Sequence, residues 1–217
     1  TNKIMIVDDH PVFVLGLRSL LSNEPDMQVC AEAANESEAM SKIVTSEPDL
    51  MVTDLSLGNG SGLQLIKRIS SRYGQIKILV ASMHDERLYA ERCLHAGAHG
   101  YINKQEATAN IILAIRVVLG GELYLSDDMT RLLLDRQVRG ANKMIRQLPE
   151  ELLSDRELEV FRLIGSGLST KKIASKLSLS VKTIDTHKEH IKRKLSLTDS
   201  AEMVQRAVIW LLRESVV

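Results

Sequence analysis

The chain has 217 residues, 44% of them hydrophobic and 26% charged, which is the composition of a globular protein and the length of two domains. No apolar run approaches the roughly 18 residues of a membrane-spanning helix, and no secretion signal opens the chain, so we expect a cytoplasmic protein without a membrane partner. Residues 1–153 contain 16 basic and 20 acidic side chains, whereas residues 154–217 contain 12 basic and 8 acidic ones. Two halves of opposite charge indicate two different partners.

The first half alternates short apolar runs with helix-like segments. The runs, which have the length of strands, span residues 3–7, 27–33, 49–54, 77–82 and 100–103. The helix-like segments that follow them span residues 12–22, 36–46, 61–71, 85–97 and 106–121. Five strand–helix units predict an α/β fold, a doubly wound five-stranded parallel sheet.

Polar residues stand at the carboxyl ends of four of these strands. Asp8 and Asp9 end the first, Asp54 ends the third, Ser82 ends the fourth and Lys104 follows the fifth. Ligands of such sheets bind at this edge, and three carboxylates gathered there suit Mg²⁺. A dication would also make the adjacent acids Asp8 and Asp9 tolerable, and a hydroxyl and an ammonium group could hold the oxygens of a phosphoryl group.

A single aspartate after a strand is more often a helix N-cap or a turn former than a site residue. Five chemically matched residues at one sheet edge are much harder to explain in that way. We therefore predict a metal and phosphoryl site there.

Residues 1–121 resemble a response-regulator receiver domain, and the segments DDHPVFVLGL and AGAHGYINK resemble its NarL/FixJ branch. The resemblance implies that a sensor histidine kinase phosphorylates Asp54, and that Tyr101 is an aromatic switch that turns inward upon this modification. A lone aromatic on a strand is otherwise usually core filler. The resemblance further implies a Mg²⁺ site made by the side chains of Asp8, Asp9 and Asp54 and the carbonyl of Ser56, with Ser82 and Lys104 contacting the phosphoryl oxygens.

Two positions depart from the usual receiver pattern. Leu57-Gly58 replaces a Met-Pro pair and leads into GNGSG, whose three glycines are expected to loosen the loop beside Asp54. Gln105 stands where many receivers have proline after the lysine, so we expect no cis bond there. Neither change removes a reacting group, but both bear on the lifetime of the phosphorylated state.

The two halves are joined by a short segment. Gly120-Gly121 ends the last helix of the first half, a helix is expected from about residue 127 to 138, and residues 139–151 have no amphipathic period. We therefore expect a receiver domain at 1–121, a linker with a short helix at 122–150 and a second domain at 151–217.

Four helix-like segments make up the second half, at residues 153–167, 169–177, 181–195 and 199–212. Ser154 and Glu157 have the spacing of a capping box, and Ser180 is expected to cap the third helix. The tight turn between the second and third helices predicts a helix-turn-helix inside a four-helix bundle. On the third helix Ile184, Ile191 and Leu195 share an apolar face.

The outward face of that helix mixes cations with short polar groups, and residues 169–194 carry eight basic and two acidic side chains. A charge-rich helix face is usually only solvated, but this charge next to the turn favours DNA. The motif formed by Ser180, Thr183, Ile184, His187, Ile191, Lys194 and Leu195 resembles the LuxR-type DNA-binding domain. The resemblance implies base readout by Asp185, Thr186 and Glu189, and phosphate contacts by Thr170, Lys171, Lys182, His187, Lys188 and Lys192. His187 could equally be a packing residue.

Together the two resemblances imply a response-regulator transcription factor rather than an enzyme. Its partners would be a sensor kinase, double-stranded promoter DNA, a second copy of the chain and, as a further candidate, RNA polymerase. One alternative is a DNA-binding regulator that ignores phosphorylation and uses its receiver only for dimerisation or other sensing. A second is a small phosphatase or a flavin-binding module on the same fold, although no positioned base and no phosphate-cradling loop after the first strand are evident in the sequence.

Overall fold

The computed structural model describes residues 1–57, 60–139 and 149–214. The chain divides into two compact units, Thr1–Asp135 and Arg136–Val217, and each is described by itself. None of the helices in the described ranges has both the length and the apolar character needed to cross a membrane.

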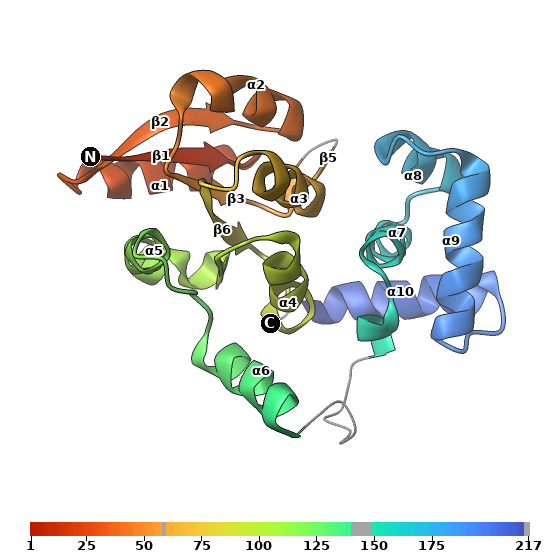
Figure 1. Ribbon diagram of the computed structural model, residues 1–217. Helices are drawn as coiled ribbons and strands as arrows, with labels where there is room; N and C mark the ends of the chain where they lie inside the picture. The colour runs from red at the N-terminus through yellow and green to blue at the C-terminus, as the bar shows by residue number, and fades with distance from the viewer. Residues whose placement is uncertain (58–59, 140–148, 215–217) are drawn as a thin grey trace. The chain divides into compact units, whose positions relative to one another are not determined.

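The first unit is the predicted parallel sheet (Figure 1). Its strands are β1 (Asn2–Val7), β2 (Met27–Ala33), β3 (Leu50–Thr53), β6 (Lys77–Ser82) and β7 (Gly100–Asn103). Neighbouring strands are parallel and follow the order β2-β1-β3-β6-β7. The connecting helices are α1 (Pro11–Ser22), α2 (Glu36–Ser46), α3 (Gly62–Arg72), α4 (Glu86–Ala96) and α5 (Lys104–Leu119). The chain order of strands and helices confirms the expected doubly wound fold.

Alternate residues of the strands pack into two separate hydrophobic cores, one on each face of the sheet. Met5 and Val7 of β1 belong to the cluster that also holds buried residues of α2, α3 and α4. Ile4 and Ile6 belong to the cluster on the other face, beneath α1 and α5. Because both faces of the sheet are covered by helices, its strands read as continuous apolar runs rather than alternating ones.

The loop after Asp54 contains an unexpected hairpin. Two-residue strands β4 (Ser56–Leu57) and β5 (Gly60–Ser61) pair antiparallel there. A Cβ on Gly62 would lie 2.1 Å from the carbonyl oxygen of Asp54 and 2.6 Å from Cα of Leu55. Gly62 therefore permits a close approach of the backbone, a role that the expected loosening of the loop did not include. Residues 58 and 59 of the same loop lie outside the described residues.

Beyond α5, the helix α6 (Asp127–Arg139) lies where a connecting helix was expected. Residues 140–148, which belong to the predicted linker, fall outside the described parts of the chain. All described peptide bonds are trans, including the bond before Gln105.

The second unit is helical. A short 3₁₀ turn, η1 (Pro149–Leu152), precedes α7 (Asp155–Gly165), α8 (Thr170–Lys176), α9 (Val181–Lys194) and α10 (Ser200–Glu214). Serines cap the first three helices: Ser154 forms the predicted capping box with Glu157, and Ser169 and Ser180 accept backbone N–H groups of α8 and α9. Phe161 of α7 packs on Trp210 of α10, their ring centroids 5.5 Å apart.

Candidate functional site

Three aspartates meet at the carboxyl edge of the sheet, as predicted. Asp8 follows β1 and Asp54 follows β3, and they are 4% and 2% exposed, whereas Asp9 faces solvent. One ligand atom from each of these residues and from His10 lies within 4.8 Å of the others. Two nearly buried carboxylates this close require a counter-charge.

Lys104 supplies part of that charge from the N-terminus of α5. Its Nζ lies 2.7 Å from Oδ2 of Asp8 and 2.8 Å from Oδ2 of Asp54, and its side chain is 6% exposed. The ammonium group also lies over the ring of Phe13, 4.7 Å from the centroid. The structure thus brings together residues that are 50 and 96 positions apart in the sequence.

His10 is a member of the cluster that the sequence reasoning missed. It stands at the N-cap position of α1 directly after the acid pair, and its Nδ1 lies 2.9 Å from Oδ1 of Asp8 and 3.0 Å from Oδ1 of Asp9. Its position directly after two aspartates and before Pro11, which starts a helix, was the available signal.

The donor set fits a hard dication. Each candidate ligand of the cluster other than His10 is a carboxylate oxygen, and Lys104 pairs with two of the three carboxylates, those of Asp8 and Asp54. Asp54 also uses Oδ1 to accept the backbone N–H of Leu55 at 2.6 Å, which fixes the orientation of the carboxylate. The acidic pocket is therefore suited to a magnesium-type ion.

The predicted phosphoryl-contacting and switch residues adjoin the cluster. Ser82, at the end of β6, is fully buried. Tyr101 on β7 is 1% exposed and turned inward, and its hydroxyl donates to the carbonyl oxygen of His84 at 2.8 Å. Burial raises the pKa of Tyr101 well above its ordinary value, so the hydroxyl keeps its proton and acts as a donor.

Ser56, whose carbonyl was expected to help hold the metal, lies on β4. Its hydroxyl and Nε2 of His84 are 2.9 Å apart, and the imidazole of His84 stacks on Tyr89 of α4. This contact joins the loop after Asp54 to the loop after Ser82.

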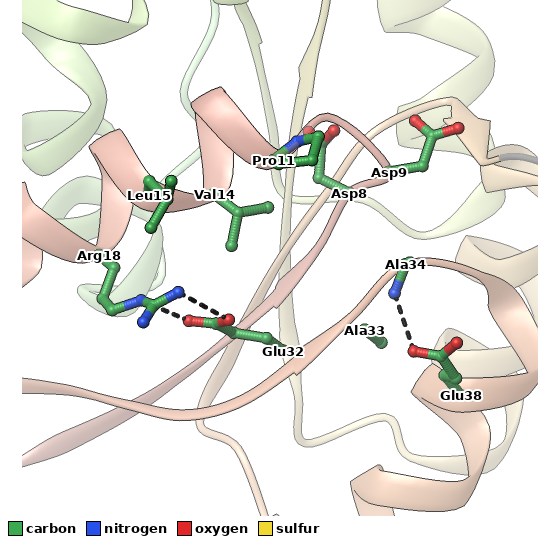
Figure 2. A pocket seen from close by; sticks show the side chains of 10 residues that line it. All are labelled: Asp8, Asp9, Pro11, Val14, Leu15, Arg18, Glu32, Ala33, Ala34 and Glu38. Carbon is green, nitrogen blue, oxygen red and sulfur yellow. Dashed lines mark hydrogen bonds and ion pairs between the residues drawn. The ribbon is translucent and has the colours of Figure 1, made fainter.

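A pocket of about 410 Å³ opens beside the acid pair, between α1 and the loop after β2 (Figure 2). Asp8 and Asp9 line it, but Asp54, Ser82 and Lys104 do not. Arg18 of α1 is held by Glu32, with Nε 2.8 Å from Oε1. The pocket therefore adjoins the acid cluster without containing the predicted acceptor.

In the second unit, α9 presents the polar face that the sequence predicted. Ile184 and Ile191 are fully buried, while Leu195, the C-cap residue, is half-buried. The predicted base-reading residues on this helix, all exposed, are Asp185, Thr186 and Glu189.

The predicted phosphate-contacting residues gather on α8 and α9. Nζ of Lys188 lies 3.3 Å from the hydroxyl of Thr170, which brings the two helices together at one surface. Lys171 and Lys182 are exposed. Nζ of Lys192 lies 2.8 Å from Oε1 of Glu189. A predicted phosphate contact and a predicted base-reading residue are therefore ion-paired with each other.

His187 faces partly inward. Its Nδ1 is buried and has no hydrogen-bond partner among the described residues. Burial lowers its pKa below the ordinary value, so the ring is neutral at physiological pH. This environment favours the packing role that the sequence left open.

Glu157 of α7 binds two side chains of α9. Its carboxylate accepts from Nζ of Lys194 at 2.6 Å and from the backbone N–H of Ser154 at 2.8 Å, and lies 3.4 Å from Nδ1 of His190. Burial alone would raise the pKa of Glu157, but the bonds from Lys194 and Ser154 outweigh it, and the pKa is lowered. The charged carboxylate thus holds the polar helix in place.

The fold and these two sites define a class of protein: a receiver with an acidic, lysine-paired cluster at the edge of its sheet, followed by a helix-turn-helix unit with a basic outward face. Comparison with known proteins agrees. Residues 4–116 match the response regulator receiver domain, and residues 151–207 match the luxR family of bacterial regulatory proteins. The chain belongs to the response regulators of the NarL/FixJ type.

Two of three similar proteins match nearly the whole chain, and the third matches about two thirds of it. The oxygen regulatory protein NreC of Staphylococcus haemolyticus is 39% identical over 209 residues, which cover 95% of this chain and 96% of that protein. The structure of RcsB from Salmonella enterica bound to promoter P1flhDC with the phosphomimetic BeF₃⁻ is 26% identical, with a TM-score of 0.73 and coverage of 100% and 99% of the two chains. A LuxR-family response regulator from Aurantimonas is 34% identical and covers 64% of this chain and 99% of its own, with a TM-score of 0.59.

Proposed function

We propose that phosphorylation of Asp54 by a sensor histidine kinase controls the binding of a dimer of this chain to promoter DNA. The observation that carries the proposal is the convergence of Asp8, Asp54 and Lys104, with Nζ of Lys104 within 2.8 Å of both carboxylates. Because its partners would be DNA and a kinase, we place its action in the cytoplasm. We also retain the domain limits 1–121, 122–150 and 151–217 as part of the proposal.

In the proposed reaction, an oxygen of Asp54 attacks the phosphorus of a phosphohistidine. A P–O bond forms as the P–N bond breaks, and the imidazole takes up a proton as it leaves. Lys104, already ion-paired with Asp54, is placed to hold an oxygen of the incoming phosphoryl group, and Ser82 offers a hydroxyl to another. His10, whose Nδ1 lies 3.6 Å from Oδ2 of Asp54, belongs to the same cluster.

Asp8, Asp9, Asp54 and the carbonyl of Ser56 would hold Mg²⁺. When bound, the ion would neutralise the carboxylates and offset the charge of the phosphoryl group. The buried side chains of Ser82 and Tyr101 would then lie next to the modified side chain of Asp54. We assign Tyr101 the role of the switch residue, because its hydroxyl bonds to the same loop that begins at Ser82.

The second unit would bind the DNA. Lysines of α8 and α9 would neutralise phosphates, and Asp185, Thr186 and Glu189 would read base edges in the major groove. RcsB has been seen bound to promoter DNA and as two dimers bound to two parallel DNAs, which supports the extension to a dimer here. Two half-sites read by a dimer carry twice the sequence information of one short helix.

The test of the receiver chemistry is an intact-mass measurement after incubation with Mg²⁺ and a small phosphoryl donor. We expect one phosphoryl adduct in the parent and none in Asp54→Ala. Ser71→Ala, a change at an exposed residue of α3, is the matched control and should retain the adduct. Equal adducts in the parent and in Asp54→Ala would contradict the assignment of Asp54.

The second candidate function is DNA binding without phosphorylation. The loop that flanks the proposed acceptor favours it, because this loop has the glycine-rich sequence GNGSG in place of the usual receiver pattern. A single measurement distinguishes the two functions: the affinity for one duplex before and after phosphorylation. It changes under the first function and stays the same under the second.

A further inference from the structure

Residues 122–133 follow the receiver match, which ends at residue 116, and precede the luxR-family match, which begins at residue 151. They nevertheless pair with the edge strand of the sheet in the first unit. The backbone N–H of Tyr101 donates to the carbonyl of Tyr124 at 2.8 Å, and the N–H of Tyr124 donates to the carbonyl of His99 at 3.1 Å. Gly100 and Tyr124 form a parallel bridge. Since β7 is the last strand of the sheet, this pairing covers part of an edge that would otherwise be open.

Gly100 makes this approach possible. A Cβ at this position would lie 2.9 Å from the carbonyl oxygen of Tyr124 and 3.0 Å from its Cβ. The nearest obstacle is backbone, which cannot turn aside as the end of a flexible side chain could. A side chain at residue 100 would therefore push the segment away from β7.

The same segment is tied to α4 at its next residues. The backbone N–H of Ser126 donates to Oε1 of Glu86, in the first turn of α4, at 2.9 Å. The hydroxyl of Ser126 accepts from the N–H of Met129 at 3.1 Å and so caps the start of α6. Met129 is 1% exposed and lies in the core cluster that includes Tyr101.

We infer that residues 122–133, the first part of the 122–150 segment, are held on the receiver at 1–121, and that Gly100 and Glu86 are positioning residues that connect Tyr101 and α4 to α6. Tyr101 is bonded through its hydroxyl to the loop after Ser82 and through its backbone to Tyr124. A change of Tyr101 or of α4 therefore moves the start of α6 through direct hydrogen bonds. This role rests on the proposed phosphorylation of Asp54, because it concerns how that modification reaches the rest of the chain.

The test uses the full chain with Gly100→Ala and, as the matched control, Gly16→Ala. A Cβ on Gly16, in α1, would meet nothing within 4 Å. Three quantities are measured for each variant: the phosphoryl adduct by intact mass, hydrogen exchange in residues 122–133, and the affinity with and without phosphorylation for a duplex selected from a random-sequence library by the phosphorylated parent.

Gly100→Ala should take up the phosphoryl group as the parent does, because it touches none of the residues at the acid cluster. Exchange in residues 122–133 should be about tenfold faster or more, since their hydrogen bonds to β7 are broken. The gain in DNA affinity upon phosphorylation should be lost, whereas Gly16→Ala should keep it. Glu86→Ala, a change at a half-buried residue on α4, should give the same pattern and replaces Gly100→Ala should that variant fail to fold.

Faster exchange with an undiminished gain in affinity would overturn the role of the segment and leave the proposed function intact. Unchanged exchange in both variants would show that the segment is not held by these contacts, and would overturn the inference as well. A parent that takes up no phosphoryl group, or gains no affinity from it, would instead overturn the proposed function on which this role depends.

Discussion

Replacing Glu157 with glutamine should loosen the hold of α7 on the polar helix α9. Glutamine retains the size of the side chain and can still accept the N–H of Ser154, but it removes the charge that faces Lys194. A hydrogen bond to a charged group contributes about 1.5–3 kcal/mol when well shielded. Because the side chain of Lys194 is 34% exposed, solvent screening reduces this, and we expect a loss of about 1–2 kcal/mol in the free energy of unfolding.

The assay is urea unfolding of the full chain followed by the fluorescence of Trp210, the single tryptophan, which packs on Phe161 of the helix that carries Glu157. Glu159→Gln is the matched control. It breaks a part-buried i,i+3 pair with Arg156 on the same helix, at 2.7 Å, and such pairs within a helix contribute about 0.2–0.5 kcal/mol.

The effect should also depend on pH in one direction. The pKa of Glu157 is lower in the folded protein than its ordinary value, so its charge stabilises the fold above the ordinary carboxyl range, and this contribution is lost as the pH falls through the folded pKa. The gap between parent and Glu157→Gln is therefore full at neutral pH and closes on acidification. Equal stability of the two glutamine variants at neutral pH, or a gap that widens in acid, would refute the reasoning.

Further predictions concern the loop after Asp54 and the DNA-binding face. Gly62→Ala should lower the free energy of unfolding by more than about 2 kcal/mol, because its Cβ meets the backbone of Asp54. The control Gly16→Ala should be neutral or should stabilise the protein by up to about 1 kcal/mol. Both variants are compared by urea unfolding followed by circular dichroism. Lys182→Ala should weaken binding to all duplexes alike and reduce the slope of log affinity against log salt by about 0.9, so an unchanged slope would exclude a phosphate contact. Asp185→Ala should instead reduce discrimination at one base position by about 1–3 kcal/mol, measured with single-substitution duplexes, and a uniform loss across them would argue against base readout.

The sheet could be predicted because its physical signal is strong. A parallel strand covered on both faces must be apolar throughout, and runs such as residues 3–7 and 77–82 show this without any alignment. Site residues at strand ends then share one edge by topology alone, which is why Asp8, Asp54 and Lys104 could be placed together.

The features that were missed have no periodic signal. The hairpin of β4 and β5 has two residues in each strand, too few for an alternating pattern. Tyr124 pairs with β7 through a single bridge, and nothing in its local sequence indicates that partner. His10 belongs to the acid cluster because of where the first turn of α1 places its ring, and that is a matter of backbone path rather than residue type. The pairing of Glu189 with Lys192 follows helical spacing and could have been anticipated.

The most direct measurement of the central claim is a titration of one selected duplex of about 30 base pairs, long enough for two half-sites a helical turn apart, with phosphorylated and unphosphorylated protein. Asp54→Ala treated with the same phosphoryl donor is measured alongside. The account predicts tighter binding by the phosphorylated parent and no response in Asp54→Ala. The same affinity in all three samples, with the adduct present in the parent, would contradict it.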